Sequence, residues 1–335
     1  MKSTVKKASM QEGINRYNMN LYKITIKPIT SFCSPLQSDT FFGAFCWSYL
    51  YRYGESALQE MIFHCKAGKP DIIFSNAFPE GHLPMPLGVE SSQKGTGLLS
   101  KQERYQIYID NKERDHFSMI RLEDFNQIIN CQYPILFRDA DIADEYKIMS
   151  WRNMVSRQTG TVENADSESH LFEIDEIFTC ENFDIYILST LETEILSRTL
   201  EDMFFFGIGA QRSVGKGAFR ILNGPKLFEG FKIPKNPNAF VALSNFIPHK
   251  GHPVKGFYEE FVKYPKIPYL SSEKDSPFKK PLIFIKAGSV FFDQTIMTFY
   301  GSCIENVALK NGKISDEIIT GAYTIAVPCC IDFEM

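Results

Sequence analysis

Signals for metal binding, secretion and membrane insertion are missing from this sequence. Its eight cysteines include no C-x-x-C pair, and Cys329 and Cys330 are adjacent, a poor spacing for zinc. The most apolar run, Phe41 to Tyr51, is too short to cross a bilayer. The polar, lysine-bearing start lacks the apolar stretch of a signal peptide. We therefore expect a soluble cytoplasmic protein with reduced thiols, no metal, no cofactor and no membrane partner.

Catalytic signatures are also scarce. The sequence contains no G-x-S-x-G elbow and no H-E-x-x-H motif. Among six histidines, only His249 and His252 lie close together, in a segment flanked by prolines. Without a nearby Glu or Cys this H-x-x-H pair is a weak metal signal, and a solvated loop explains it better. We predict that the chain has no catalytic residue.

Charge is distributed unevenly along the chain. The formal net charge of −4 argues against a protein whose whole surface coats nucleic acid. Residues 1–30 hold six basic residues and one acidic residue, whereas residues 101–185 hold eighteen acidic and nine basic residues. A local basic track on a mildly acidic body is compatible with one bound nucleic-acid strand and with protein neighbours.

The strongest candidate site is a glycine-rich loop at residues 207–217, which read G-I-G-A-Q-R-S-V-G-K-G. Glycine backbones allow close approach to a ligand, and exposed N–H groups beside cations suit phosphate. From Met203 to Lys226 there are four basic residues and no acidic one, so an anionic ligand is expected. The candidate RNA-binding residues here are Gly207, Gly209, Arg212, Ser213, Gly215, Lys216 and Gly217.

This loop matches neither of two familiar phosphate motifs. Five residues separate Gly209 from Gly215, where a P-loop requires four, and Gly217 replaces the hydroxyl residue. A dinucleotide fingerprint follows a strand and opens a helix, but residues 193–206 are predicted to be helix and 218–222 strand. A plain glycine-rich turn between helix and strand therefore remains an equal alternative.

Two further segments carry candidate RNA contacts. Residues 151–160 combine Arg152 and Arg157 with amides and large apolar side chains, a mixture that RNA-binding proteins use. An exposed amphipathic helix end explains the same pattern equally well. Near the N-terminus, Ser38 and Thr40 stand at a predicted helix start, where capping explains Ser and Asp but not Gly43. Gly43 is consistent with close approach of a ligand or another backbone.

The predicted elements suggest an α+β fold with two domains. Residues 1–20 form an arm, and residues 21–224 a first domain with an insertion at about 88–165 that carries some local helix. Residues 171–178 and 183–191 are predicted to pair as a hairpin. Without the insertion, the order of strand, helix, strand, strand, helix, strand is the ferredoxin-like split βαβ pattern. After a linker at 225–237, residues 238–335 are predicted to form a second, degenerate copy.

Taken in order, these motifs resemble the RAMP superfamily of CRISPR effector subunits. The motifs are S-D-T-F-F-G at 38–43, the arginines and T-G before L-F-E at 171–173, and the glycine-rich loop. The segments G-F-Y at 256–258, F-K-K-P-L at 278–282 and A-G-S-V-F at 287–291 are similar to the fourth-subunit family of type III-A (Csm) complexes. The resemblance covers most of residues 21–332.

This resemblance implies two tandem ferredoxin-like (RRM-like) domains, with a thumb-like insertion in the first, and a non-catalytic role in antiviral defence. It implies that the 5′ tag of the CRISPR RNA (crRNA) binds here, with Arg212, Ser213 and Lys216 holding tag phosphates and Arg152 and Arg157 in or near the thumb. The implied partners are the crRNA, the large polymerase/cyclase-like subunit, a backbone RAMP subunit and target RNA near the tag boundary.

Two other classes of function remain open on the sequence. A related RAMP endoribonuclease would process precursor crRNA by metal-independent acid–base cleavage, with His249 or His252 as acid or base. A structural scaffold would use the glycine-rich loop to pack against a protein partner without touching RNA.

Overall fold

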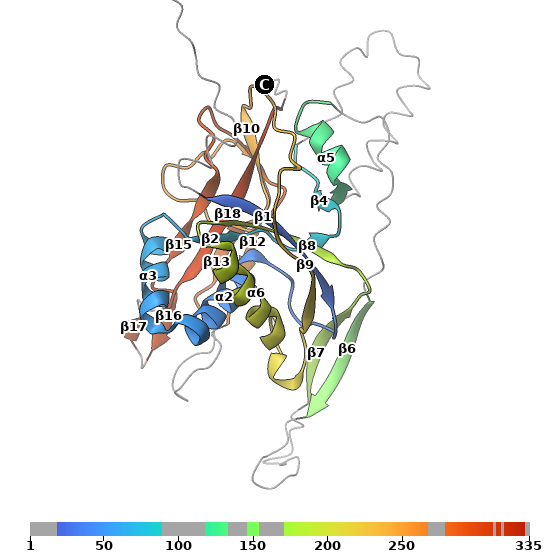
Figure 1. Ribbon diagram of the computed structural model, residues 1–335, viewed down its shortest axis with the longest axis vertical. Helices are drawn as coiled ribbons and strands as arrows, with labels where there is room; N and C mark the ends of the chain where they lie inside the picture. The colour runs from blue at the N-terminus through green and yellow to red at the C-terminus, as the bar shows by residue number, and fades with distance from the viewer. Residues whose placement is uncertain are drawn as a thin grey trace, which may run out of the picture.

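The computed structural model describes residues 19–88, 118–132, 146–153, 171–266, 279–310, 313–315 and 318–331. Its first sheet has the strand order β2-β8-β1-β9, with β3 also pairing with β8 (Figure 1). These strands are β1 (Asn20–Pro28), β2 (Ile72–Phe74), β3 (Phe78–Pro79), β8 (Phe183–Ser189) and β9 (Phe219–Leu227). All seven residues of β8 are buried, as expected for a central strand covered on both faces.

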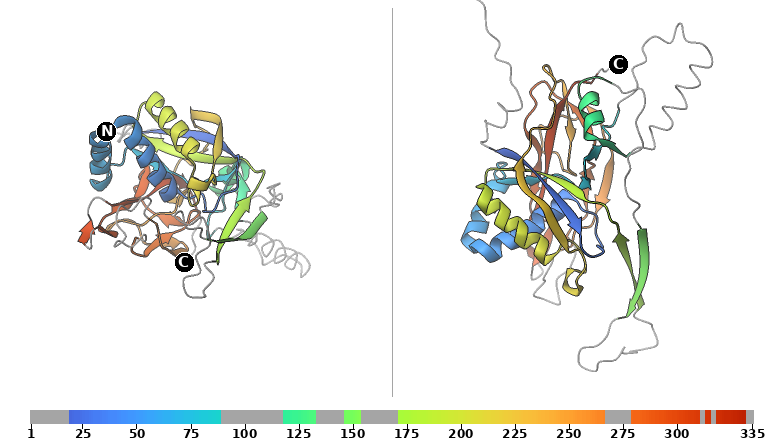
Figure 2. Two further views of the ribbon diagram at one scale, coloured as in Figure 1. Left: turned by 90° about the horizontal axis from the view of Figure 1, so that it is seen from below. Right: turned by 45° about the vertical axis from the view of Figure 1, so that its right-hand side comes forward.

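Helices α2 (Ser38–Tyr53) and α6 (Thr193–Phe206) pack against each other and alongside the first sheet. The predicted helix at residues 193–206 is confirmed as α6, and its residues Leu196, Leu200, Met203 and Phe204 are all buried. Helix α3 (Glu55–Lys66) follows directly after Gly54, which ends α2 with a φ of 85°. Figure 2 shows these three helices gathered on one side of the molecule. None of the described helices has the length and apolarity needed to cross a bilayer.

The second half of the chain forms another sheet with the order β11-β14-β10-β18-β15. Its strands are β10 (Ala239–Ala242), β11 (Gly256–Phe257), β14 (Val290–Phe292), β15 (Phe299–Ile304) and β18 (Thr320–Cys329). Two-stranded ribbons are formed by β12 (Glu260–Lys263) with β13 (Leu282–Ile285), and by β16 (Ala308–Lys310) with β17 (Lys313–Ser315). No helix follows residue 214 in the described part of this half. The predicted α+β class is confirmed.

One apolar core joins the two sheets. Helix α2 contacts β18 as well as β2, and the Phe42 ring lies against Gly321. The Tyr323 hydroxyl donates a hydrogen bond of 2.7 Å to the carbonyl of Cys65, and the Ser244 hydroxyl one of 2.7 Å to the carbonyl of Phe74. The two halves are therefore held together by buried contacts as well as by the chain that connects them.

The predicted hairpin between residues 171–178 and 183–191 is wrong. Strand β7 (Leu171–Phe178) pairs with β6 (Tyr146–Asn153), and together they form a ribbon that projects from the sheets (Figure 2). Both edges of β8 are already occupied, by β1 on one side and by β2 and β3 on the other. No free edge of β8 remains for β7, so the short connection between them is not a hairpin turn.

Three further expectations are corrected. The region predicted to be an insertion without core elements supplies β5 (Met119–Arg121), which pairs with β4 (His82–Pro84), and α5 (Leu122–Ile128), whose Phe125 is fully buried. The N-cap of α2 is Gln37, whose side chain does not cap the helix; the N–H of Ser38 donates instead to the side-chain oxygen of Asn76 at 3.1 Å. Phe231 packs in the core, so the predicted linker is tied to the fold.

Candidate nucleic-acid interface

The glycine-rich loop connects α6 to β9, in the predicted order of helix, loop and strand. Helix α6 ends at Phe206, because Gly207 adopts a φ of 84° that does not continue the helix. A short 3₁₀ turn, Arg212–Val214, forms the outer part of the loop, with Ser213, Val214 and Gly215 exposed.

Hydrogen bonds within the chain close this loop at its base. The N–H of Ile208 donates to the carbonyl of Gly217 at 2.8 Å, and the N–H of Gly217 donates to the carbonyl of Ser31 at 2.8 Å. Several loop N–H groups are thus already satisfied. The N–H groups of Val214, Gly215 and Lys216 donate to carbonyls inside the loop, and that of Ala210 donates to the hydroxyl of Ser34, so the loop is held in shape by its own hydrogen bonds.

Gly217 and Gly215 differ in what surrounds them. Gly217 has a φ of 71°, and a Cβ at this position would collide with the carbonyl oxygen of Ile208. Its small size is explained by the packing of the loop on itself. Gly215 has a φ of 83°, but no atom lies within 4 Å of where its Cβ would stand. The plain-turn interpretation accounts for Gly217, whereas the space beside Gly215 is open to a ligand.

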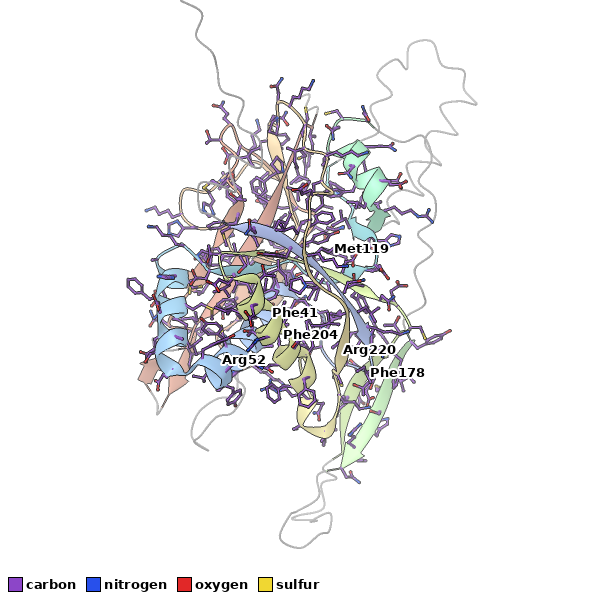
Figure 3. The ribbon with its side chains drawn as sticks, viewed as in Figure 1. Phe41, Arg52, Met119, Phe178, Phe204 and Arg220 are labelled. Carbon is purple, nitrogen blue, oxygen red and sulfur yellow. The ribbon has the colours of Figure 1, made fainter. Side chains whose placement is uncertain are left out.

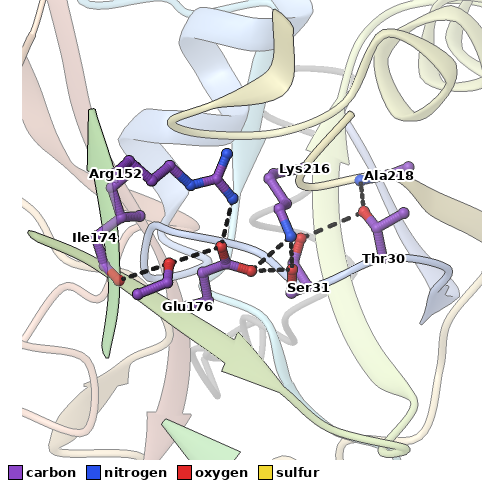
Figure 4. Close-up of polar contacts among 8 residues, drawn as sticks. Thr30, Ser31, Arg152, Ile174, Glu176, Lys216 and Ala218 are labelled. Carbon is purple, nitrogen blue, oxygen red and sulfur yellow. Dashed lines mark hydrogen bonds and ion pairs between the residues drawn. The ribbon is translucent and has the colours of Figure 1, made fainter. Parts of the chain in front are cut away.

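Lys216 and Arg152 meet at one buried carboxylate, that of Glu176 on β7 (Figure 4). Lys216 Nζ lies 2.5 Å from Glu176 Oε2, and Arg152 Nη2 lies 2.8 Å from Oε1. The hydroxyl of Ser31 donates to Oε2 at 2.8 Å, and that of Ser150 donates to Oε1 at 3.1 Å. The network therefore joins the glycine-rich loop, the β6–β7 ribbon and the segment that follows β1.

These contacts change the acidity of Glu176. The ammonium of Lys216, followed by the hydroxyl of Ser31 and the guanidinium of Arg152, lowers its pKa to about 2, against the opposing effect of burial. The carboxylate is ionised at neutral pH and 5% exposed. Two cations around one anion leave the cluster with one net positive charge. The side chains of Lys216 and Arg152 remain 22% and 36% exposed, so an anion can reach both.

The predicted RNA-binding residues are thus only partly brought together. Arg152 lies on β6 beside the glycine-rich loop, which excludes the helix-end alternative for residues 151–153. Arg157 lies outside the described residues. Ser38 is buried, and its hydroxyl donates to the carbonyl of Asn245 at 3.1 Å. No hydrogen bond or ion pair between described residues joins Ser38 or Thr40 to the loop, so their RNA contacts stay predictions.

Glu176, the centre of this arrangement, is not among the residues predicted from the sequence. It stands in an acidic strand between residues that give no sign of burial, and its neighbours Glu173 and Asp175 are exposed. One signal was available: alternation along 171–178 places Glu176 on the same face as Ile174, which is buried. Its cationic partners, however, are 24 and 40 residues away in sequence.

The described ranges do not meet the requirements of a metal site. No three His, Cys, Asp or Glu side chains gather there as a metal site would require. Aromatic rings lie beside the loop instead. Phe205 is 83% exposed at the end of α6, and Phe206 packs at a centroid distance of 6.1 Å from Tyr51. The arrangement offers positive charge next to exposed aromatic rings.

No protein-family model and no curated protein matches this sequence. Its fold does match solved structures. A chain of the Csm1–Csm4 cassette in complex with AMPPNP aligns with a TM-score of 0.58 and 18% identity, over 94% of this chain and 100% of that chain. The Csm1–Csm4 cassette in complex with cA4 gives a TM-score of 0.57 and 18% identity, with the same coverage.

A chain of the Csm3–Csm4 subcomplex in the type III-A CRISPR–Cas interference complex is similar as well. It aligns with a TM-score of 0.56 and 14% identity, over 92% of this chain and 99% of that chain. Csm4 is the subunit that both kinds of assembly share. This chain therefore has the fold of a subunit of type III-A CRISPR–Cas (Csm) assemblies, the family that its motifs resemble.

Proposed function

We propose that this chain is the non-catalytic crRNA-binding subunit of a type III-A CRISPR–Cas interference complex, in which it holds the 5′ tag of the crRNA. It links the large polymerase-like subunit to the backbone RAMP subunits. The support is that chains of the same fold occur in an assembly with Csm1 and in another with Csm3, and that the match extends over almost the whole chain.

The proposed architecture is a pair of ferredoxin-like domains with a thumb. The order β2-β8-β1-β9, with α2 after β1 and α6 after β8, agrees with the split βαβ pattern for the first domain. The second sheet, without a helix in its described residues, is the degenerate copy. The projecting β6–β7 ribbon is the base of the thumb, where the guide bends at the boundary between tag and spacer.

The glycine-rich loop carries this proposal. Its tip presents Ser213 and Gly215 to solvent, and Arg212 and Lys216 supply positive charge in a segment without acidic residues. A phosphate seated at the tip would lie beside these cations, in the open space next to Gly215. Arg152 of the β6–β7 ribbon lies next to Lys216 of the loop, so one RNA strand could contact the loop and the thumb in succession.

The experiment is RNA binding by the full chain as a function of salt. Single-stranded RNA carrying the repeat-derived tag is titrated from 50 to 200 mM salt, with wild type and with Arg212→Gln plus Lys216→Gln. Each phosphate contact contributes about 0.7 to the slope of log K against log salt, so the variant's slope should fall by about 1.4. Lys69→Gln plus Lys250→Gln, which changes two exposed lysines, controls for net charge. An unchanged slope would refute the phosphate assignment.

The endoribonuclease alternative has weaker support. The N–H groups of His249 and Gly301 both donate to Nδ1 of His252, at 3.1 and 3.4 Å, and the His252 ring packs edge-on against Tyr300. These contacts tie the imidazole into the second sheet. Incubation of the chain with repeat RNA in the absence of metal is the test: sequence-specific cleavage that His252→Ala abolishes would establish the enzyme.

A further inference from the structure

Pairing of β1 with β9 places cations directly opposite each other. Lys27 is the register partner of Arg220, and Lys23 is the partner of Lys226. Lys23 has an anionic neighbour, since its Nζ lies 3.0 Å from the buried carboxylate of Asp184. Lys27 and Arg220 are both exposed, and in the described part of the chain neither forms an ion pair.

The Lys27–Arg220 pair is unfavourable for the fold itself. Side chains directly opposite in an antiparallel pair have Cβ atoms about 4.5–5.5 Å apart, and like charges there destabilise the sheet. The register partners Ile26, which is buried, and Ile221, which is partly buried, hold β1 and β9 together and do not need the two charges. Paired cations at exposed positions are explained when a bound anion neutralises both of them.

The Lys27–Arg220 pair lies close to the glycine-rich loop, which indicates that both would bind the same anionic polymer. The N–H of Ile29 donates to the carbonyl of Ala218 at 2.8 Å, where the glycine-rich loop runs into β9. Arg220 lies two residues further along β9, about 7 Å at strand spacing. It is labelled on β9 in Figure 3. An anionic polymer that leaves the loop and follows this edge strand meets the Lys27–Arg220 pair next.

We propose that Lys27 and Arg220 form a second phosphate clamp, which continues the path of single-stranded RNA from the glycine-rich loop along the edge of the first sheet. This rests on the proposed function and extends it to residues outside the loop. The guanidinium of Arg220 presents a planar fork to phosphate oxygens, and the ammonium of Lys27 adds a point charge from the facing strand.

The decisive variant is Lys27→Glu, which places a carboxylate opposite Arg220. Within the free protein this replaces repulsion by an ion pair, so the melting temperature should stay equal to that of wild type or rise. For RNA it removes one cation and occupies the other, so the slope of log K against log salt should fall by about 1.4. Between 50 and 200 mM salt, wild type should then lose about sevenfold more affinity than the variant. Lys69→Glu is the control of equal charge change on an exposed lysine.

Each outcome decides the proposal. A weaker salt dependence with undiminished stability supports the clamp, because a purely structural role cannot produce both. A slope equal to that of the Lys69→Glu control overturns it, as does a melting temperature below wild type. Loss of partner-subunit binding with RNA binding intact assigns the pair to an acidic protein surface and also overturns it. If the salt dependence of RNA binding weakens in the Arg212/Lys216 variant but not in Lys27→Glu, the clamp is wrong and the proposed function stands. If the wild-type chain binds no RNA, the proposed function itself fails.

Discussion

Glu176→Gln is the substitution that most directly probes how the candidate site is built. It keeps the shape of the side chain but removes the negative charge that Lys216 and Arg152 share, and it turns an amide NH₂ toward donors. Two cations are left close together without their carboxylate. We expect the glycine-rich loop and the β6–β7 ribbon to separate, because Glu176 contacts both of them.

The magnitude follows from the acidity of this group. A pKa lowered from 4.5 to about 2 corresponds to about 3.4 kcal/mol of preferential stabilisation of the charged form. The two cations keep 22% and 36% of their side-chain exposure, and solvent screening reduces the value to about 2 kcal/mol. For a chain of this size, that corresponds to a fall in melting temperature of about 3 °C.

Urea unfolding of wild type and Glu176→Gln over a range of pH is the assay. Because the folded-state pKa lies below the unfolded value, the stabilisation is fully present above about pH 5 and is lost as the pH falls toward 2. The difference between the two proteins should therefore shrink in acid. Glu173→Gln, on the exposed face of the same strand, is the matched control and should be neutral. A Glu176→Gln penalty that does not change with pH, or no penalty at neutral pH, would refute the reasoning.

Three further predictions concern single residues. Gly217→Ala should destabilise the protein by about 2 kcal/mol or more in urea unfolding, because its Cβ meets Ile208, whereas Gly215→Ala should cost only about 1 kcal/mol for its positive φ. Gly43→Ala should stabilise by about 0.5–1 kcal/mol, since the site lies within α2 and has no atom within 4 Å; a drop in RNA or partner affinity would instead show that a ligand approaches there. Burial, and then the nearby imidazole of His249, lowers the pKa of His252. The unfolded chain therefore binds the proton more readily than the folded chain, and stability should fall as the pH drops below about 6.5. His252→Gln should flatten that part of a melting-temperature profile.

Local sequence patterns were enough to predict the helix, loop and strand at the site. The helix predicted at 193–206 and the strand predicted at 218–222 depend on neighbours within one element, and both are confirmed as α6 and β9. Strand β15 (Phe299–Ile304), by contrast, was not predicted, although it pairs with β18 over six residues. Its pairing depends on a partner about 20 residues later, which no local pattern shows.

Contacts between segments far apart in the sequence could not be predicted. The β7–β8 hairpin was predicted from a short connection, but competition for the edges of β8 decided otherwise. The same limit applies to Glu176, whose role comes from Lys216 and Arg152 arriving from two distant segments. The Lys27–Arg220 pair likewise exists only once β1 and β9 are in register.

Crosslinking within the assembled complex tests the central claim most directly. The chain is purified with its partners, RNA is crosslinked by ultraviolet light, and the crosslinked peptides and nucleotides are sequenced. The account predicts crosslinks from residues 207–217 of this chain to the repeat-derived 5′ nucleotides of the crRNA. Recovery of an intact complex whose crRNA tag crosslinks to other subunits, and never to this chain, would contradict it.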